Sequence, residues 1–92
     1  MNDAQRSRLT ATRTQLDAID ERLLSVLAER AKVVEELWAW KRSEGLPLTD
    51  PQREAEHVEQ LVARAKALGL EEKATRAVLA TIVGKPLTAC SP

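Results

Sequence analysis

The chain has 92 residues, with 14 lysines and arginines balanced by 14 aspartates and glutamates. A formal net charge of zero argues against a nucleic-acid platform or a membrane-surface protein, and two aromatic residues argue against recognition of stacked bases. One cysteine excludes an internal disulfide, and the polar start is not a secretory signal. We therefore expect one cytoplasmic domain that covers residues 1–92.

Glycine and proline interrupt the chain at a few places, and the segments between them are rich in residues that favour helices. This pattern predicts three helices over residues 5–44, 51–68 and 71–84. Gly45 and Gly69 stand where glycines commonly end a helix. No segment alternates apolar and polar residues as a half-buried strand does, so the predicted fold is all-α.

The first predicted helix carries an apolar stripe, because large apolar residues recur on it at steps of three and four. Arg30 occupies a stripe position, Arg13 extends the stripe upstream, and Lys41 borders it downstream. A buried cation is costly without a partner, so these groups snorkel to solvent, pair with a glutamate, or bind an anion. Three cations on one stripe favour an anion site. The stripe consists of Leu16, Ile19, Leu23, Val26, Val33, Leu37 and Trp40.

The predicted length of this helix indicates a dimer. Forty helical residues span about 60 Å, whereas a compact monomer of this size has a radius of gyration of about 12–13 Å. The helix should therefore pair with a second, antiparallel copy related by a two-fold axis. Arg13 and Arg30 lie about 25 Å apart along the axis, so one small ligand would meet Arg13 of one chain and Arg30 of the other. Lys41 can converge with Arg30, which predicts two equivalent sites, each completed by both chains.

The segment "LTDPQRE", residues 48–54, has the signature of a helix start. Asp50 suits the capping position and Pro51 the first helical position. Arg53 is unexpected there, because the first turn of a helix is positively polarised. It either forms a weak surface pair with Asp50 or Glu56, or it helps to bind an anionic ligand.

These residues resemble a known family. The segment "RTQLDAIDERLLSVLAER" (13–30), then Lys41, then "GLPLTDPQRE" (45–54), is similar to the all-helical chorismate mutases over about positions 9–83. The resemblance implies an intertwined helical homodimer with three helices per chain. It also implies the rearrangement of chorismate to prephenate, on the route to Phe and Tyr.

The resemblance also implies roles for the cations. Arg13, reaching into the partner's site, and Arg30 match the arginines that bind the two substrate carboxylates. Lys41 matches the lysine that donates to the ether oxygen. Arg53 matches a further arginine of the pocket, which would explain a cation in the first turn of a helix.

The remaining roles concern the substrate ring. The backbone around Asp50 and the side chain of Glu54 match the contact to the ring hydroxyl, and apolar residues would pack on the ring. The apolar positions are Leu37, Val83 and Leu87.

The implied chemistry needs no cofactor. The rearrangement is unimolecular and pericyclic, and it requires no nucleophile, metal or redox group. Arginines that grip two carboxylates would hold the reacting carbons close, and Lys41 would stabilise charge on the ether oxygen. His57 is more simply a partly exposed helical residue than a ligand, and Cys90 a tail thiol without a catalytic role.

The C-terminal tail departs from the family pattern. Pro86 stands where the family commonly has a serine, and Cys90 stands where it has a glutamine or glutamate that shares the ether oxygen with the lysine. Gly84 and Pro86 also predict an early end to the third helix. Three explanations remain open. A partner, such as the enzyme that opens the shikimate pathway, completes the site; Thr88 or a tail backbone group does so; or the substrate is an analogue such as 4-amino-4-deoxychorismate.

Two competing functions share this fold. Isochorismate pyruvate-lyase has the same cation set, although the segment "GLPLTDPQRE" looks more like the mutase version. The second competing function is that of a non-catalytic helical dimerisation or regulatory module. Arg30 argues against it, because a pure interface favours leucine or alanine at a stripe position.

Overall fold

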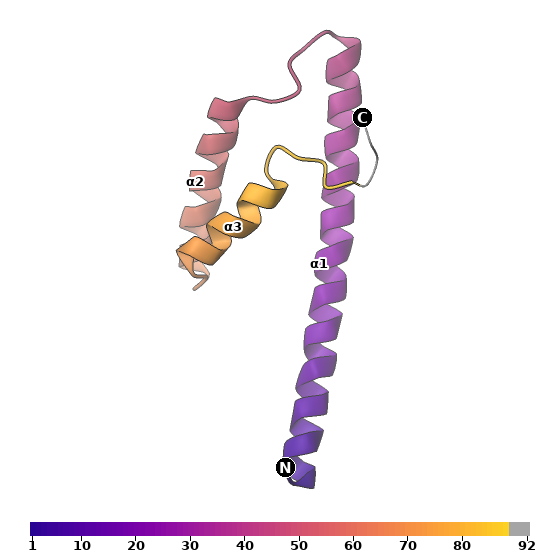
Figure 1. The fold of residues 1–92 in the computed structure, drawn as a ribbon, viewed down its shortest axis with the longest axis vertical. Helices are drawn as coiled ribbons and strands as arrows, with labels where there is room; N and C mark the ends of the chain where they lie inside the picture. Colours follow the sequence, from indigo (N-terminus) through magenta and orange to yellow (C-terminus); the bar gives the residue numbers. More distant parts are fainter. Residues whose placement is uncertain (89–92) are drawn as a thin grey trace. The chain divides into compact units, whose positions relative to one another are not determined.

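The computed structural model describes residues 1–88, and this part of the chain consists of three α-helices joined by short segments (Figure 1). Helix α1 is Asp3–Ser43, α2 is Pro51–Ala67 and α3 is Glu72–Ile82. Each bound lies within two residues of its prediction, and no strand occurs between residues 1 and 88, which confirms the all-α class. The chain divides into two units, Met1–Arg30 and Ala31–Pro92.

Both ends of α1 carry local capping interactions. Asn2 Oδ1 accepts from the backbone N–H of Gln5 at 2.8 Å, and Gln5 Oε1 accepts from the N–H of Asn2 at 2.8 Å, which is a reciprocal capping box. At the other end Gly45 adopts φ +67°, and the N–H of Leu46 reaches back to the carbonyl of Lys41 at 2.8 Å. Gly45 therefore ends the helix as predicted, through a Schellman-type turn that requires a left-handed residue.

Helix α2 begins and ends as the sequence predicts. Asp50 is its capping residue, and its Oδ1 accepts from the backbone N–H of Arg53 at 3.2 Å. Pro51 takes the first helical position, where a missing N–H costs nothing. Gly69 follows the helix with φ +84°, and the N–H of Leu70 bonds to the carbonyl of Ala65 at 2.9 Å.

Helix α3 is short, and it ends before the tail that departs from the family pattern. Glu71 caps it by accepting from the backbone N–H of Ala74 at 2.5 Å. The last helical residue is Ile82, and Gly84 follows with φ +74°. The predicted early end of this helix is confirmed.

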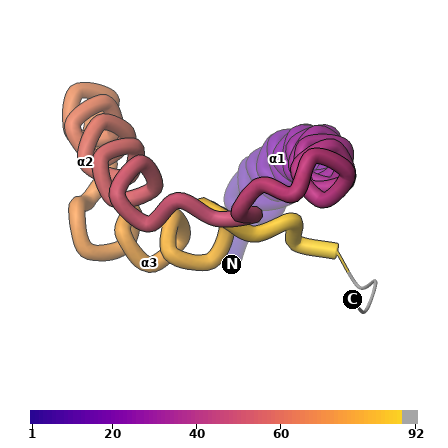
Figure 2. Tube along the Cα trace, turned by 90° about the horizontal axis from the view of Figure 1, so that it is seen from above, coloured from indigo at the N-terminus to yellow at the C-terminus, as the bar shows by residue number. Residues whose placement is uncertain are grey.

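Helices α2 and α3 lie side by side and bury a small apolar core (Figure 2). Val62 and Ala65 of α2 and Leu79 of α3 are buried. These residues lie on the inward face of two amphipathic helices, where the burial of apolar surface stabilises the pair.

An exposed ion-pair network also links α2 to α3. Arg76 of α3 binds Glu59 of α2 through two hydrogen bonds of 2.6 and 2.9 Å, and Lys66 of α2 pairs with Glu72 of α3. The bond from Arg76 lowers the pKa of Glu59, and the bond from Lys66 lowers the pKa of Glu72, each below the ordinary value of 4.5. The same bond to Glu59 raises the pKa of Arg76.

We expect acid to weaken this link. Because both carboxylates have lowered pKa values in the folded chain, their pairs stabilise the fold above the unfolded pKa near 4.5. The contribution is lost as the pH falls through the lower folded values. Thermal unfolding should show Arg76→Ala less stable than the parent at pH 7, with a difference that narrows as the pH is lowered below 4.5. Lys73→Ala, an exposed change on α3, should show no such convergence; a difference for Arg76→Ala that does not narrow below pH 4.5 would contradict the ion-pair account.

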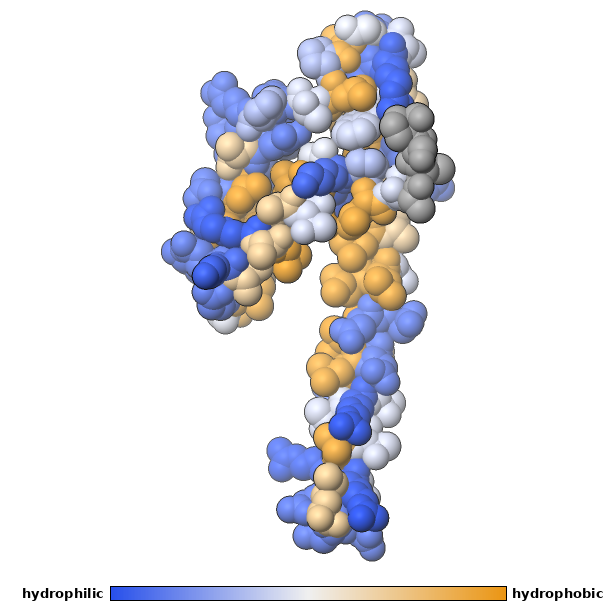
Figure 3. Space-filling model, viewed as in Figure 1, coloured by the Kyte–Doolittle hydropathy of each residue, from blue (hydrophilic) through white to orange (hydrophobic). Residues whose placement is uncertain are grey.

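The apolar stripe of α1 is largely exposed in the single chain. Figure 3 shows apolar side chains gathered along this helix, and Ala31 is its one buried residue. Trp40 is 53% exposed, so it does not form a core within one chain. The other members of the stripe, Leu16, Ile19, Leu23, Val26, Val33 and Leu37, are also exposed.

Candidate functional site

Two of the predicted anion-binding arginines lie on α1 within the unit Met1–Arg30. Arg13 is exposed, and its side chain makes no ion pair with any residue from 1 to 88. Arg30 is half-buried at the end of this unit. Arg13 is therefore available to a ligand or a second chain, as the shared-site hypothesis requires.

Lys41 lies in the last turn of α1 and is held by the loop that follows. It is half-buried, and its Nζ donates to the carbonyl of Leu48 at 3.2 Å. An ammonium group has three donors, so this bond leaves two for a ligand. The carbonyl of Leu48 orients the ammonium towards the loop that leads to Asp50. Sequence reasoning missed this contact, because a backbone acceptor leaves no signature in the side chains.

Arg53 lies in the first turn of α2, at the positively polarised end of the helix. Asp50 accepts from its backbone N–H, but within residues 1–88 its guanidinium forms no ion pair with Asp50 or Glu56. The surface pair with Asp50 or Glu56 is therefore not formed among residues 1–88. Arg53 borders a polar hollow of about 190 Å³ on α2, together with Glu56, His57 and Gln60.

Glu54 follows Arg53 and is half-buried against the chain that leaves α3. Its carboxylate lies over Gly84, so closely that a methyl group on that glycine would stand 2.5 Å from Oε1. This approach joins the start of α2 to the end of α3 at a predicted site residue. In the sequence, Gly84 indicates only the end of a helix, because the neighbour of its α-carbon comes from a segment thirty residues away.

The predicted apolar contacts differ in exposure. Val83 is half-buried directly after α3, whereas Leu37 and Leu87 are 44% and 48% exposed. Pro86, in the tail that departs from the family pattern, is half-buried, and Thr88 is exposed. Cys90 lies outside the described residues.

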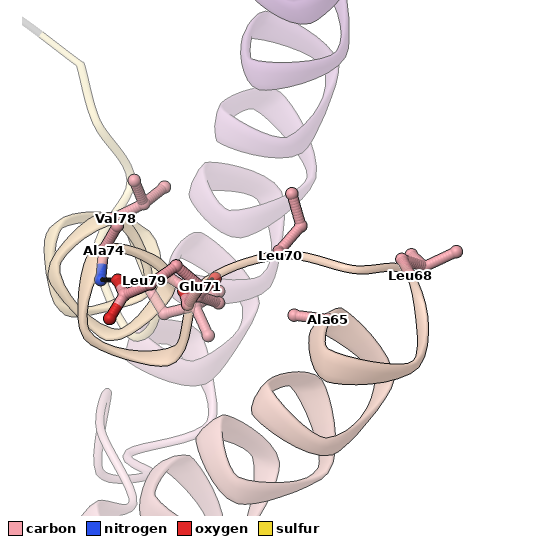
Figure 4. A pocket seen from close by; sticks show the side chains of 8 residues that line it. Ala65, Leu68, Leu70, Glu71, Ala74, Val78 and Leu79 are labelled. Carbon is pink, nitrogen blue, oxygen red and sulfur yellow. Dashed lines mark hydrogen bonds between the residues drawn. The ribbon is translucent and has the colours of Figure 1, made fainter.

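A separate, apolar hollow lies between α2 and α3 (Figure 4). It measures about 380 Å³, and its walls include Leu70, Val78 and Leu79. None of the predicted site residues lines it, and a dianion would find almost no polar group there. No pattern in the sequence predicts this hollow, since it depends on how the two helices meet.

Among residues 1–88, no group of histidines, cysteines and carboxylates is arranged to hold a metal ion. His57 is half-buried on α2. None of the three helices is long and apolar enough to cross a membrane.

Within residues 1–88 the fold is all-helical, and the predicted basic site residues lie on α1 and in the first turn of α2. The family model of type II chorismate mutases matches residues 12–85, so the chain belongs to this family, which implies an isomerase. The chain is also 36% identical over 80 residues to the T-protein of Enterobacter agglomerans. That alignment covers 87% of the chain but 21% of the relative, so the chain spans about a fifth of the length of this curated relative. No solved structure shows a significant match.

Proposed function

We propose that this chain catalyses the rearrangement of chorismate to prephenate. The observation that carries the proposal is the family match over residues 12–85, which spans Arg13, Arg30, Lys41 and Arg53. The match ends before Pro86 and therefore leaves out the tail that departs from the family pattern.

The arginines would bind the substrate as a folded dianion. Arg13 of one chain and Arg30 of the other would each grip a carboxylate, since guanidinium and carboxylate groups match in geometry. Arg53 would add positive charge at a helix end that already favours anions. Held in this way, the two carbons that must join stay close, which removes much of the entropic barrier to a unimolecular reaction.

Lys41 would act on the bond that breaks. As the ether C–O bond breaks and the new C–C bond forms, negative charge builds on the ether oxygen. A fixed ammonium group stabilises this charge more in the transition state than in the substrate, and so accelerates the step. The hydrogen bond to Leu48 supports this role, because it holds the ammonium in place before substrate arrives.

Glu54 and the backbone around Asp50 would hold the ring hydroxyl. A carboxylate is an acceptor for such a hydroxyl, and it would equally accept from the amino group of 4-amino-4-deoxychorismate. This contact supports binding of the ring without fixing which of the two substrates is preferred. Leu37, Val83 and Leu87 would pack on the ring's apolar faces.

The active form would be an antiparallel homodimer. Support comes from α1, whose exposed stripe includes Leu23 at 55% and Trp40 at 53%. An apolar surface of this extent on a helix is typical of an interface. A sizing measurement should give twice the 10.2 kDa of one chain. A monomer at micromolar concentration would contradict the shared site.

The proposal is tested by adding chorismate to the purified protein, following loss of the diene absorbance and identifying the product by chromatography. Prephenate supports the mutase, and pyruvate released from isochorismate would identify the lyase. Product formed from the amino analogue alone would identify that analogue, and not chorismate, as the substrate. No turnover with any of these compounds, with or without a shikimate-pathway enzyme as activator, would leave a helical interaction module.

Replacing Arg53 should weaken catalysis without weakening the fold. We expect Arg53→Ala to lower kcat/KM about 10- to 100-fold, mainly through KM, because a hydrogen bond to a charged group contributes about 1.5–3 kcal/mol. The unfolding temperature should hold or rise slightly, since a cation leaves the positive end of α2. Arg64→Ala, an exposed change near the other end of α2, is the control and should retain activity. Full activity in Arg53→Ala would exclude this arginine from the site.

A further inference from the structure

Gly84 lies unusually close to the side-chain carboxylate of Glu54. A β-carbon on Gly84 would lie 2.5 Å from Oε1, 2.7 Å from Cδ and 3.0 Å from Oε2 of Glu54. All three carboxylate atoms thus lie within 3.0 Å of the space that a side chain would occupy. The carboxylate is packed against the open side of the glycine, at a place where the backbone also has φ +74°.

The other two glycines have no such close neighbour, although their φ angles are also positive. Gly45 has φ +67° and Gly69 has φ +84°, and a β-carbon on either would meet nothing within 4 Å. Backbone conformation alone therefore accounts for a glycine at these two helix ends. At Gly84 there is a second requirement, which is space for the carboxylate.

We propose that Gly84 is a positioning residue for the carboxylate of Glu54. The inference rests on the proposed function, in which Glu54 accepts a hydrogen bond from the substrate ring. A glutamate has three side-chain torsions, and in the first turn of a helix it would sample several rotamers. The backbone at Gly84 forms a wall on one side of the carboxylate and so restricts where its oxygens lie.

The wall comes from the segment that follows α3, so the position of the carboxylate depends on where α3 ends. Helix α3 stops at Ile82, and Gly84 brings the backbone across the start of α2. A longer α3 or a larger residue at this place would displace the carboxylate. A misplacement of about 1 Å in a catalytic site can cost about 100-fold in rate.

The test compares Gly84→Ala with Gly69→Ala. Both changes put a methyl group on a backbone with positive φ, but the methyl group meets Glu54 at position 84 alone. We expect Gly84→Ala to lower kcat/KM for chorismate about tenfold or more, and Gly69→Ala to leave it within about twofold of the parent. Equal losses in the two variants would overturn the proposal.

A shorter carboxylate provides the second readout. Glu54→Asp withdraws the carboxylate by one methylene and leaves room for a methyl group at position 84. If Gly84 acts through Glu54, kcat/KM of the Glu54→Asp/Gly84→Ala variant should equal that of Glu54→Asp, because the two effects share one contact. If the fold-loss of kcat/KM in the double variant equalled the product of the losses in the two single variants, the effects would be independent and the proposal would be overturned.

The design separates this inference from the function on which it rests. Turnover by the parent chain decides the function, and an inactive parent chain would overturn both. An active parent whose Gly84 and Gly69 variants behave alike would overturn the positioning role and leave the mutase intact. If Gly84→Ala alone does not fold by circular dichroism, the double variant decides. Folding and activity at the level of Glu54→Asp support the role, and failure to fold contradicts it.

Discussion

Replacing Lys41 with alanine is expected to lower kcat for chorismate about 100- to 1,000-fold while KM changes little, because one well-aimed donor to a developing oxyanion has about this effect. The ammonium meets the ether oxygen most strongly when the C–O bond is breaking, so its loss acts on turnover more than on binding. Steady-state kinetics on the purified variant would measure both constants.

Two further variants would test whether the charge on Lys41 is responsible. Lys41→Gln keeps an N–H donor on a shorter side chain but carries no charge, and we expect it to recover little activity. Lys32→Ala removes an exposed lysine from the same helix and should leave kcat unchanged. If Lys41→Gln were nearly as active as the parent, the lysine would serve only to hold the loop.

Mixing two inactive variants should restore activity if each site draws on both chains. Arg13→Ala and Lys41→Ala homodimers should each be nearly inactive. In a hybrid dimer one site would combine Arg13 and Lys41 from unaltered positions, and the other would lack both. After equal amounts are unfolded and refolded together, half of the dimers are hybrids, so about a quarter of the parent activity should return.

The matched control uses two residues that the proposal assigns to the same chain. Arg30→Ala mixed with Lys41→Ala should recover nothing, since each site of the hybrid lacks one of the two cations. Hybrid formation can be verified by mass spectrometry of differently tagged chains. Recovery in the Arg30 mixture, or none in the Arg13 mixture despite hybrids, would contradict the proposed division of the site between subunits.

The helices could be predicted because their signals are local. Asp50 and Pro51 mark the start of α2, and Gly45 and Gly69 mark the ends of two helices, through interactions with residues at most five positions away. The choice of helix over strand likewise depends on spacing along a single segment. These features need no knowledge of the rest of the chain.

The candidate site could be predicted in its residues but not in its contacts. Arg53 was identified from its conflict with the helix dipole, and the structure leaves its guanidinium without an ion pair among residues 1–88. The partner of Lys41 was not predictable, because any residue at position 48 would supply the same carbonyl. The exposure of the α1 stripe, by contrast, was expected from the length of the helix, which exceeds the size of a compact monomer, and the structure confirms it.

By itself the sequence determined three helices, their ends and the family to which the chain belongs, because these depend on short-range capping, periodicity and the order of charged residues. The tertiary structure decided that the carboxylate of Glu54 packs on Gly84, and that Arg76 joins Glu59 across two helices. Such contacts link residues 17 or more positions apart. They form only when packing brings distant backbones together, and no local pattern of residue types encodes that approach.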